Sequence, residues 1–174
     1  MKRQVLIVDA YNMIGHWPEL EKLKKKDELA LARDELLQIL SRYHKQAFNE
    51  IIVVFDAMFV PGMTRSYKQY NLEVVWTDEG QTADTYIENL AGELMNPLTL
   101  VTVATSDQAE QWVIFSQGAL RKPAWELYQD IKRANKENSA AAKDYQIQAS
   151  VRRNPFGDEQ LAKLGKLRDE LMGK

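Results

Sequence analysis

The sequence predicts an α/β fold, a single domain in which helices cover both faces of a central, mainly parallel sheet in three layers. Short apolar runs rich in Val and Ile alternate along the chain with longer segments of helical periodicity. Strands that alternate with helices form parallel βαβ units. The chain has 174 residues, of which 45% are hydrophobic and 28% charged. This composition fits one globular domain and excludes collagen-like and disordered chains.

Four apolar runs are predicted to be buried strands, at residues 5–8, 51–55, 72–76 and 98–104. The first run ends at Asp9 and the second at Asp56. The stretch 57–69 contains Pro61 and Gly62, so we expect a loop there.

The remaining segments are predicted to be helical. One helix opens at or near Asp27, and its apolar stripe includes Ala32 or Arg33. Thr82 is expected to cap the next helix, and further helices are expected at 107–116, from Pro123 onward and at 158–172. Residues 135–153 are the least regular part. We expect this stretch to be a mobile helix or an arm that orders on binding. The chain is thus expected to have a main domain at residues 1–135 and a helical, partly basic C-terminal extension at 136–174 that packs on the domain or flanks it.

Composition excludes several kinds of chemistry. The absence of Cys excludes thiol catalysis and thiolate zinc sites, and two His residues are too few for a His-rich metal site. No apolar run approaches the roughly 18 residues needed to cross a bilayer, so we expect a cytoplasmic protein with no membrane partner. Residues 69–120 carry 8 acidic and no basic side chains, whereas residues 121–153 carry 8 basic and 4 acidic ones. Such blocks are usually solvated faces, but they also suit a carboxylate site with a basic rim.

Acidic residues follow the predicted strands repeatedly. Asp9 and Asp56 end two strands, Asp107 comes soon after the fourth, and Asp84 lies in the first turn of the helix after the third. If the first strand lies between the second and the fourth, these carboxylates share one edge of the sheet. Carboxylates so placed repel one another unless a cation lies among them, and a site of oxygen ligands favours Mg²⁺ or Mn²⁺.

Each acid also has a simpler interpretation. Asp84 and Asp107 are favourable at helix N-termini, and Asp9 and Asp56 could merely terminate strands. Their convergence on one edge is what favours a functional site. Asn12 is either a turn former or a neutral group that orients a metal-bound water or phosphate.

Several motifs together resemble a known family. In order and spacing, VDAYNMIGHWPEL, LARDELL, VVFDA, TADTYIE, VATSDQAEQ and GALRKPAWEL look like the YacP-like branch of the NYN-domain ribonucleases, which share the PIN-like nuclease fold. The resemblance runs from about Val5 to Ile131, and the joint occurrence of VDxYN, TADxYIE and TSDxAEQ is specific. The chain departs from the family pattern at Ala10, Met58, Pro123 and Trp125, and none of these is one of the three central acids.

The resemblance implies a metal-dependent endonuclease that cleaves single-stranded RNA. Its catalytic residues would be Asp9, Asp84, Asp107 and Asn12, and its metal ligands Asp9, Asp84, Asp107 and Asp56, with Mg²⁺ or Mn²⁺ as cofactor and no nucleotide cofactor. The RNA would be an mRNA, and whether a translating ribosome is a partner stays open. We expect RNA to be held by Arg65, Lys68, Arg121, Lys122, Lys132 and Arg133 at its phosphates, with Tyr11, Tyr67 or Trp125 stacking on unpaired bases unless these rings pack in the core.

Three other classes compete with this interpretation. A receiver-type signalling domain is also a parallel α/β sheet, but it needs paired acids after the first strand and a later Lys, and this chain has Val8 before Asp9 and no Lys in residues 69–120. A haloacid-type phosphatase needs DxD after the first strand, and Tyr11 breaks that motif. A non-catalytic RNA- or ribosome-binding module on a nuclease-like fold is the nearest alternative, and the intact acids argue against it.

Overall fold

The computed structural model of the chain describes residues 2–59, 66–108, 116, 118–153 and 158–173. Within these ranges the side chains of residues 45–47, 59, 66–69, 144–153 and 158 lie outside the description.

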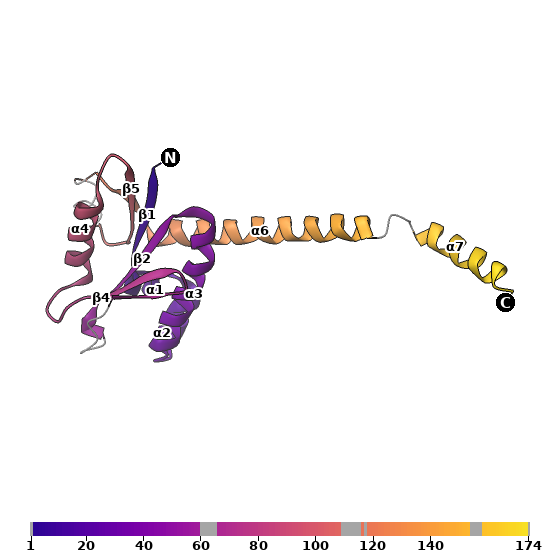
Figure 1. Ribbon diagram of the computed structural model, residues 1–174. Helices are drawn as coiled ribbons and strands as arrows, with labels where there is room; N and C mark the ends of the chain where they lie inside the picture. Colours follow the sequence, from indigo (N-terminus) through magenta and orange to yellow (C-terminus); the bar gives the residue numbers. More distant parts are fainter. Residues whose placement is uncertain (1, 60–65, 109–115, 117, 154–157, 174) are drawn as a thin grey trace. The chain divides into compact units, whose positions relative to one another are not determined.

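The described strands form one mixed sheet in the order β3-β4-β2-β1-β5-β6 (Figure 1). All neighbouring pairs are parallel except β3 and β4, which are antiparallel. Strand β1 therefore lies between β2 and β5, which confirms the predicted order and brings the carboxyl ends of these strands to one edge. The strands are β1 (Arg3–Asp9), β2 (Glu50–Phe55), β3 (Ser66–Gln69), β4 (Leu72–Trp76), β5 (Thr99–Ala104) and β6 (Leu120–Lys122).

Two of these strands were not predicted. Strand β3 lies in the stretch expected to be a loop, and that expectation was wrong for Ser66–Gln69. It is polar and pairs with β4 through a tight turn at Tyr70 and Asn71, whose φ angles are 53° and 63°. Strand β6 has three residues. Neither strand has the alternating or continuous apolar residues that predict a strand. Each lies at an edge of the sheet, where backbone pairing with one neighbour forms the strand without such a pattern.

The helical segments that precede residue 135 flank the sheet, and a short 3-10 turn, η1, covers Ala57–Phe59. Two short helices directly after β1 were not predicted: the first is capped by Asp9, and the second begins at Pro18. The predicted helix at 107–116 falls largely outside the described residues. The helices are α1 (Ala10–His16), α2 (Pro18–Lys25), α3 (Leu29–Ala47), α4 (Ala83–Leu94), α6 (Ala124–Arg153) and α7 (Asp158–Leu171).

Alternate residues of the strands supply two cores, one on each face of the sheet. Leu6 and Val8 face the side covered by α1, α2, α3 and the start of α6. Val5 and Ile7 face the side covered by α4. Figure 1 shows α4 and α3 on opposite sides of the strands. The three-layer arrangement is thus as predicted, and it follows from the two-residue period of buried strands.

The chain divides into two compact units, Met1–Ala134 and Asn135–Lys174. The sheet and the acidic residues discussed below belong to the first unit. Residues 135–153, the least regular part of the sequence, are helical and belong to α6. Among the described residues no helix has both the length and the apolar character that a membrane span requires.

Candidate active site

Asp9 lies at the centre of the carboxyl edge of the sheet. It is the last residue of β1, only 8% of its surface is exposed, and it caps α1 by accepting a hydrogen bond from the Asn12 backbone N–H at 3.2 Å. Because Asp9 pairs in register with Val54, Asp56 lies just two residues further along the neighbouring strand. The two strand-end acids therefore come to adjacent places on the edge, as the sequence predicts.

Asp56 follows β2 and is hydrogen-bonded to the first residue of α4. One carboxylate oxygen accepts the Met58 N–H at 2.8 Å, and the other accepts the Ala83 N–H at 3.2 Å. Ala83 is the first residue of α4, so this contact fixes the helix turn that carries Asp84. Asp56 was predicted to be a metal ligand, and in the structure both of its oxygens bind backbone N–H groups.

The other two acids are exposed. Asp84 lies in the first turn of α4, which is capped by the predicted Thr82 through a bond from the Thr85 N–H at 3.3 Å. Asp107 follows β5, and its backbone N–H donates to Thr105 Oγ1 at 3.1 Å. Exposure leaves both carboxylates accessible from solvent at the edge where Asp9 ends.

Electrostatics link the four acids. The pKa of Asp9 is raised to about 6, chiefly by burial and further by the charges of Asp84, Asp56 and Asp107, against the Asn12 N–H bond that lowers it. The pKa of Asp84 is raised as well, first by burial and then by Asp107 and Asp56. The carboxylates thus lie near enough for their charges to interact. Within the described part of the chain, however, no three Asp, Glu or His side chains are grouped closely enough to enclose a metal ion.

Asn12 connects the edge to the loop after β5. Its Oδ1 accepts the Ser106 N–H at 2.9 Å, and Ser106 Oγ in turn accepts the Ala124 N–H at 3.0 Å. The Trp17 indole N–H donates to the Ala124 carbonyl at 2.9 Å. Asn12 therefore holds together Asp9, the residue before Asp107 and the start of α6. The sequence predicted a catalytic role, and the observed contacts are those of a positioning residue.

The predicted phosphate-binding side chains have different surroundings. Lys122 forms an ion pair with Asp130 at 2.6 Å, Lys132 pairs with Glu19 at 2.7 Å, and Arg133 lies 3.9 Å from Asp130. Arg121 is exposed on β6. Arg65 lies outside the described residues, and of Lys68 only the backbone, in β3, is described.

Two aromatic candidates differ in exposure. Tyr11 is half-buried and packs edge-on against Phe55, with ring centroids 5.5 Å apart. Trp125 is 52% exposed and stacks on Tyr128 at 5.1 Å. Tyr67 lies on β3, and its side chain is outside the description.

Arg33 is a residue of this edge that the sequence analysis did not assign. Its guanidinium donates to the Tyr11 hydroxyl at 3.4 Å and lies 5.6 Å from the centre of the Trp76 ring. The available signal was its place on the apolar stripe of α3, where a charged residue is unexpected.

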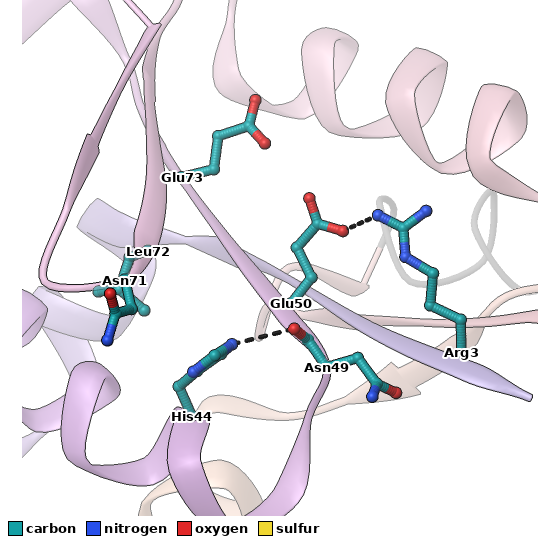
Figure 2. A pocket seen from close by; sticks show the side chains of 7 residues that line it. All are labelled: Arg3, His44, Asn49, Glu50, Asn71, Leu72 and Glu73. Carbon is teal, nitrogen blue, oxygen red and sulfur yellow. Dashed lines mark hydrogen bonds and ion pairs between the residues drawn. The ribbon is translucent and has the colours of Figure 1, made fainter.

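A cavity of about 400 Å³ lies at the opposite, amino edge of the sheet (Figure 2). Arg3 and Glu50, which begin β1 and β2, form an ion pair there, and the His44 ring bonds the Asn49 carbonyl at 3.1 Å. None of the residues predicted for catalysis lines it. Its lining consists of Arg3, His44, Asn49, Glu50, Asn71, Leu72 and Glu73.

Comparisons with known proteins agree with the motifs. The family model for the YacP-like NYN domain matches residues 6–169. The Bacillus subtilis (strain 168) protein named "Uncharacterized protein YacP" is 48% identical over 128 residues, which span 74% of this chain and 75% of that protein. The crystal structure of a W164L mutant of Rae1 (YacP) from Bacillus subtilis has a TM-score of 0.72 at 42% identity, covering 82% of each chain. A second Rae1 (YacP) crystal structure has a TM-score of 0.68 at 38% identity, covering 97% of this chain and 95% of the other. The chain therefore belongs to the YacP-like NYN domain family and has its nuclease-like fold.

Proposed function

We propose that this protein is a metal-dependent endoribonuclease that hydrolyses phosphodiester bonds in single-stranded RNA. The observation that carries the proposal is the convergence of Asp9, Asp56, Asp84 and Asp107 on one sheet edge, close enough for the other three charges to raise the pKa of Asp9. Structural roles alone do not require four mutually repelling acids in one place.

The residues at this edge suit Mg²⁺ or Mn²⁺. Their donors are carboxylate oxygens, which such ions prefer, and neither His nor Cys is among them. Mg²⁺ is commonly held by one or two carboxylates together with water and substrate phosphate, so it does not need a preformed group of three protein ligands. The arrangement of the described side chains fits this kind of site.

We assign separate roles to these residues. Asp9, Asp84 and Asp107 would hold the ion. Asp56 would position α4, and through it Asp84, while taking part in the negative charge of the site. Asn12 would position the loop that carries Asp107. When bound, the ion would activate a water molecule and stabilise charge on the phosphate, so no protein nucleophile is required.

We propose mRNA as the substrate class, cut in the cytoplasm, with the translating ribosome as a partner to be tested. The basic side chains of residues 121–133 would contact phosphates, which positions a strand without reading its sequence. Lys122, Lys132 and Arg133 would have to exchange their carboxylate partners for phosphates.

The test is cleavage of an RNA pool, with and without Mg²⁺ or Mn²⁺ and with and without a translating extract, read as new 5′ ends. We expect Asp9→Asn and Asp84→Asn to abolish cleavage while the fold persists, because each removes a ligand charge at constant volume. Asp107→Asn should act likewise or lose somewhat less. Glu93→Gln is the matched control, since it neutralises an exposed carboxylate at the far end of α4.

Wild-type cleavage by purified Asp9→Asn protein would contradict the proposal. Wild-type protein that binds RNA but leaves it uncut under all of these conditions would favour the non-catalytic RNA-binding module instead.

A further inference from the structure

We propose that Arg33, held by Tyr11 and Trp76, is a phosphate-binding subsite for the RNA strand beside the acidic edge. The inference rests on the proposed function, and it assigns a substrate contact to a residue outside the carboxylates and outside the basic segment 121–133.

The three side chains meet at the edge that carries the acids. Trp76 ends β4 and pairs in register with Phe55, the residue before Asp56. Tyr11 lies two residues after Asp9, in α1. Because the Arg33 guanidinium contacts both the Tyr11 hydroxyl and the Trp76 ring, it lies at the carboxyl ends of the strands. The electrostatics agree: burial raises the pKa of Tyr11, the hydrogen bond and charge of Arg33 oppose that rise, and the Asp56 charge adds to it.

Arg33 differs from other cations of the chain in its partners. Arg3, Arg42, Lys122 and Lys132 each lie within 4.0 Å of a carboxylate. In the described part of the chain, no ion pair involves Arg33, although its side chain is half-buried. A partly desolvated cation without an anion gains most when an external anion completes its surroundings.

The cluster also holds the guanidinium rigidly. Tyr11 packs edge-on against Phe55, and Phe55 stacks on Trp76 with centroids 4.7 Å apart and planes 18° apart. A guanidinium fixed over aromatic rings keeps its fork of N–H donors oriented, which suits two-pronged binding of a phosphate. The Trp76 indole N–H is buried and has no hydrogen-bond partner among the described residues, so this cluster retains a second unsatisfied donor.

Such a contact would solve an electrostatic problem of the site. Residues 69–120, which contribute Asp84 and Asp107, contain no Lys or Arg, so a polyanionic strand approaching this edge meets repulsion. Arg33 brings a positive charge to the edge from a different part of the chain. The phosphate it binds would be a neighbour of the scissile one, held in place while the acids and their ion act.

The experiment compares Arg33→Met, Arg33→Lys and wild-type protein in binding a labelled oligouridylate over a salt titration, with EDTA present to stop cleavage. Arg42→Met is the matched control, since Arg42 is exposed on the same helix and pairs with Glu35. We expect Arg33→Met to bind roughly tenfold more weakly, the equivalent of one charge-assisted hydrogen bond. The slope of log affinity against log salt concentration should be smaller in magnitude by about 0.7, the value for one phosphate contact on a single strand.

Arg33→Lys should keep the slope and recover part of the affinity, because a charge remains while the planar fork is lost. Arg42→Met should match the wild type. A purely structural role for Arg33 would lower the thermal midpoint of Arg33→Met and leave the salt slope unchanged, and that result overturns the inference. If wild-type protein binds and cuts RNA and Arg33→Met does so equally well, the inference fails while the proposed function stands. If wild-type protein neither binds nor cuts RNA, both are wrong.

Discussion

Replacing Asp9 by Asn should stabilise the protein at neutral pH when no metal is present. Burial and three neighbouring carboxylates raise the pKa of Asp9 from 3.8 to about 6, so folding works against its charged form. Each pKa unit corresponds to about 1.36 kcal/mol, and a shift of about two units therefore costs roughly 3 kcal/mol as an upper limit. Asn removes the charge, keeps the volume and is as good a helix N-cap as Asp, so the hydrogen bond from Asn12 persists.

The gain should depend on pH in a definite direction. Well below pH 3.8 the Asp9 carboxyl is protonated in both the folded and the unfolded chain, so its charge makes no difference between the stabilities of Asp9→Asn and wild type. As pH rises from about 4 to about 6 the unfolded chain ionises more readily than the folded one, and the wild type loses stability that the variant keeps. Above about pH 6 the difference should be complete, at up to roughly 10 °C in thermal midpoint for a chain of this size.

The assay is thermal unfolding of both proteins in EDTA across this pH range, with Asp34→Asn as the control. Asp34 is exposed on α3, so the same chemical change there should alter stability by no more than about 0.5 kcal/mol. Added Mg²⁺ or Mn²⁺ should then raise the thermal midpoint of the wild type more than that of Asp9→Asn. At an ion concentration one hundred times the dissociation constant, the free energy of unfolding of the wild type should increase by about 2.7 kcal/mol. A midpoint difference that is absent at neutral pH, or that does not change between about pH 4 and pH 7, would refute the reasoning.

Three further outcomes follow from the contacts at the same edge. Asp56→Ala should lose about 1–3 kcal/mol in chemical denaturation even in EDTA, because the Met58 and Ala83 N–H groups lose their acceptor, whereas a residue that served only as a metal ligand would show no loss. Asn12→Ala should speed hydrogen exchange at the Ser106 amide and slow RNA cleavage, and unchanged exchange would show that the bond does not hold the loop. In RNA-binding titrations, Arg121→Ala/Lys122→Ala should reduce the salt slope by roughly 1.4, the value for two phosphates, because RNA must displace Asp130 from Lys122; a smaller reduction would show that this ion pair persists and that Lys122 does not hold RNA.

The fold was largely predictable because its central part is encoded by local patterns. The runs that became β1, β2, β4 and β5 are continuous and β-branched, and β1 lies between β2 and β5 as in the common strand order on which the sequence analysis was based. What the sequence concealed are elements with little apolar surface or few residues, such as β3 and β6. The segment after Asp9 reads as a turn because it contains Asn12, Gly15 and Pro18, yet Asp9 as a cap and Pro18 at a first helical position are also helix-start signals.

The acidic residues of the candidate site could be predicted from the sequence, whereas the contacts that support them could be predicted less well. Strand ends can be located from a pattern, so the common edge of Asp9 and Asp56 follows from topology alone. The role of Asn12 depends on Ser106, which lies 94 residues away, and no local spacing encodes that contact. The sequence showed only that Arg33 is a charged residue on the apolar stripe of α3. Its contacts could not be predicted, because its partners Tyr11 and Trp76 come from two other elements.

The way the sheet ends has a consequence for the behaviour of the protein at high concentration. Its outermost strands, β3 with four residues and β6 with three, are brief, and β6 is flanked by Pro123, which cannot donate a backbone hydrogen bond. Long, flat, apolar margins invite another chain to add a strand, whereas short polar ones give it little to pair with. The edges of the described six-stranded sheet therefore offer little backbone for a neighbouring copy to pair with, and the two strands that limit this pairing are those with the weakest strand signal in the sequence.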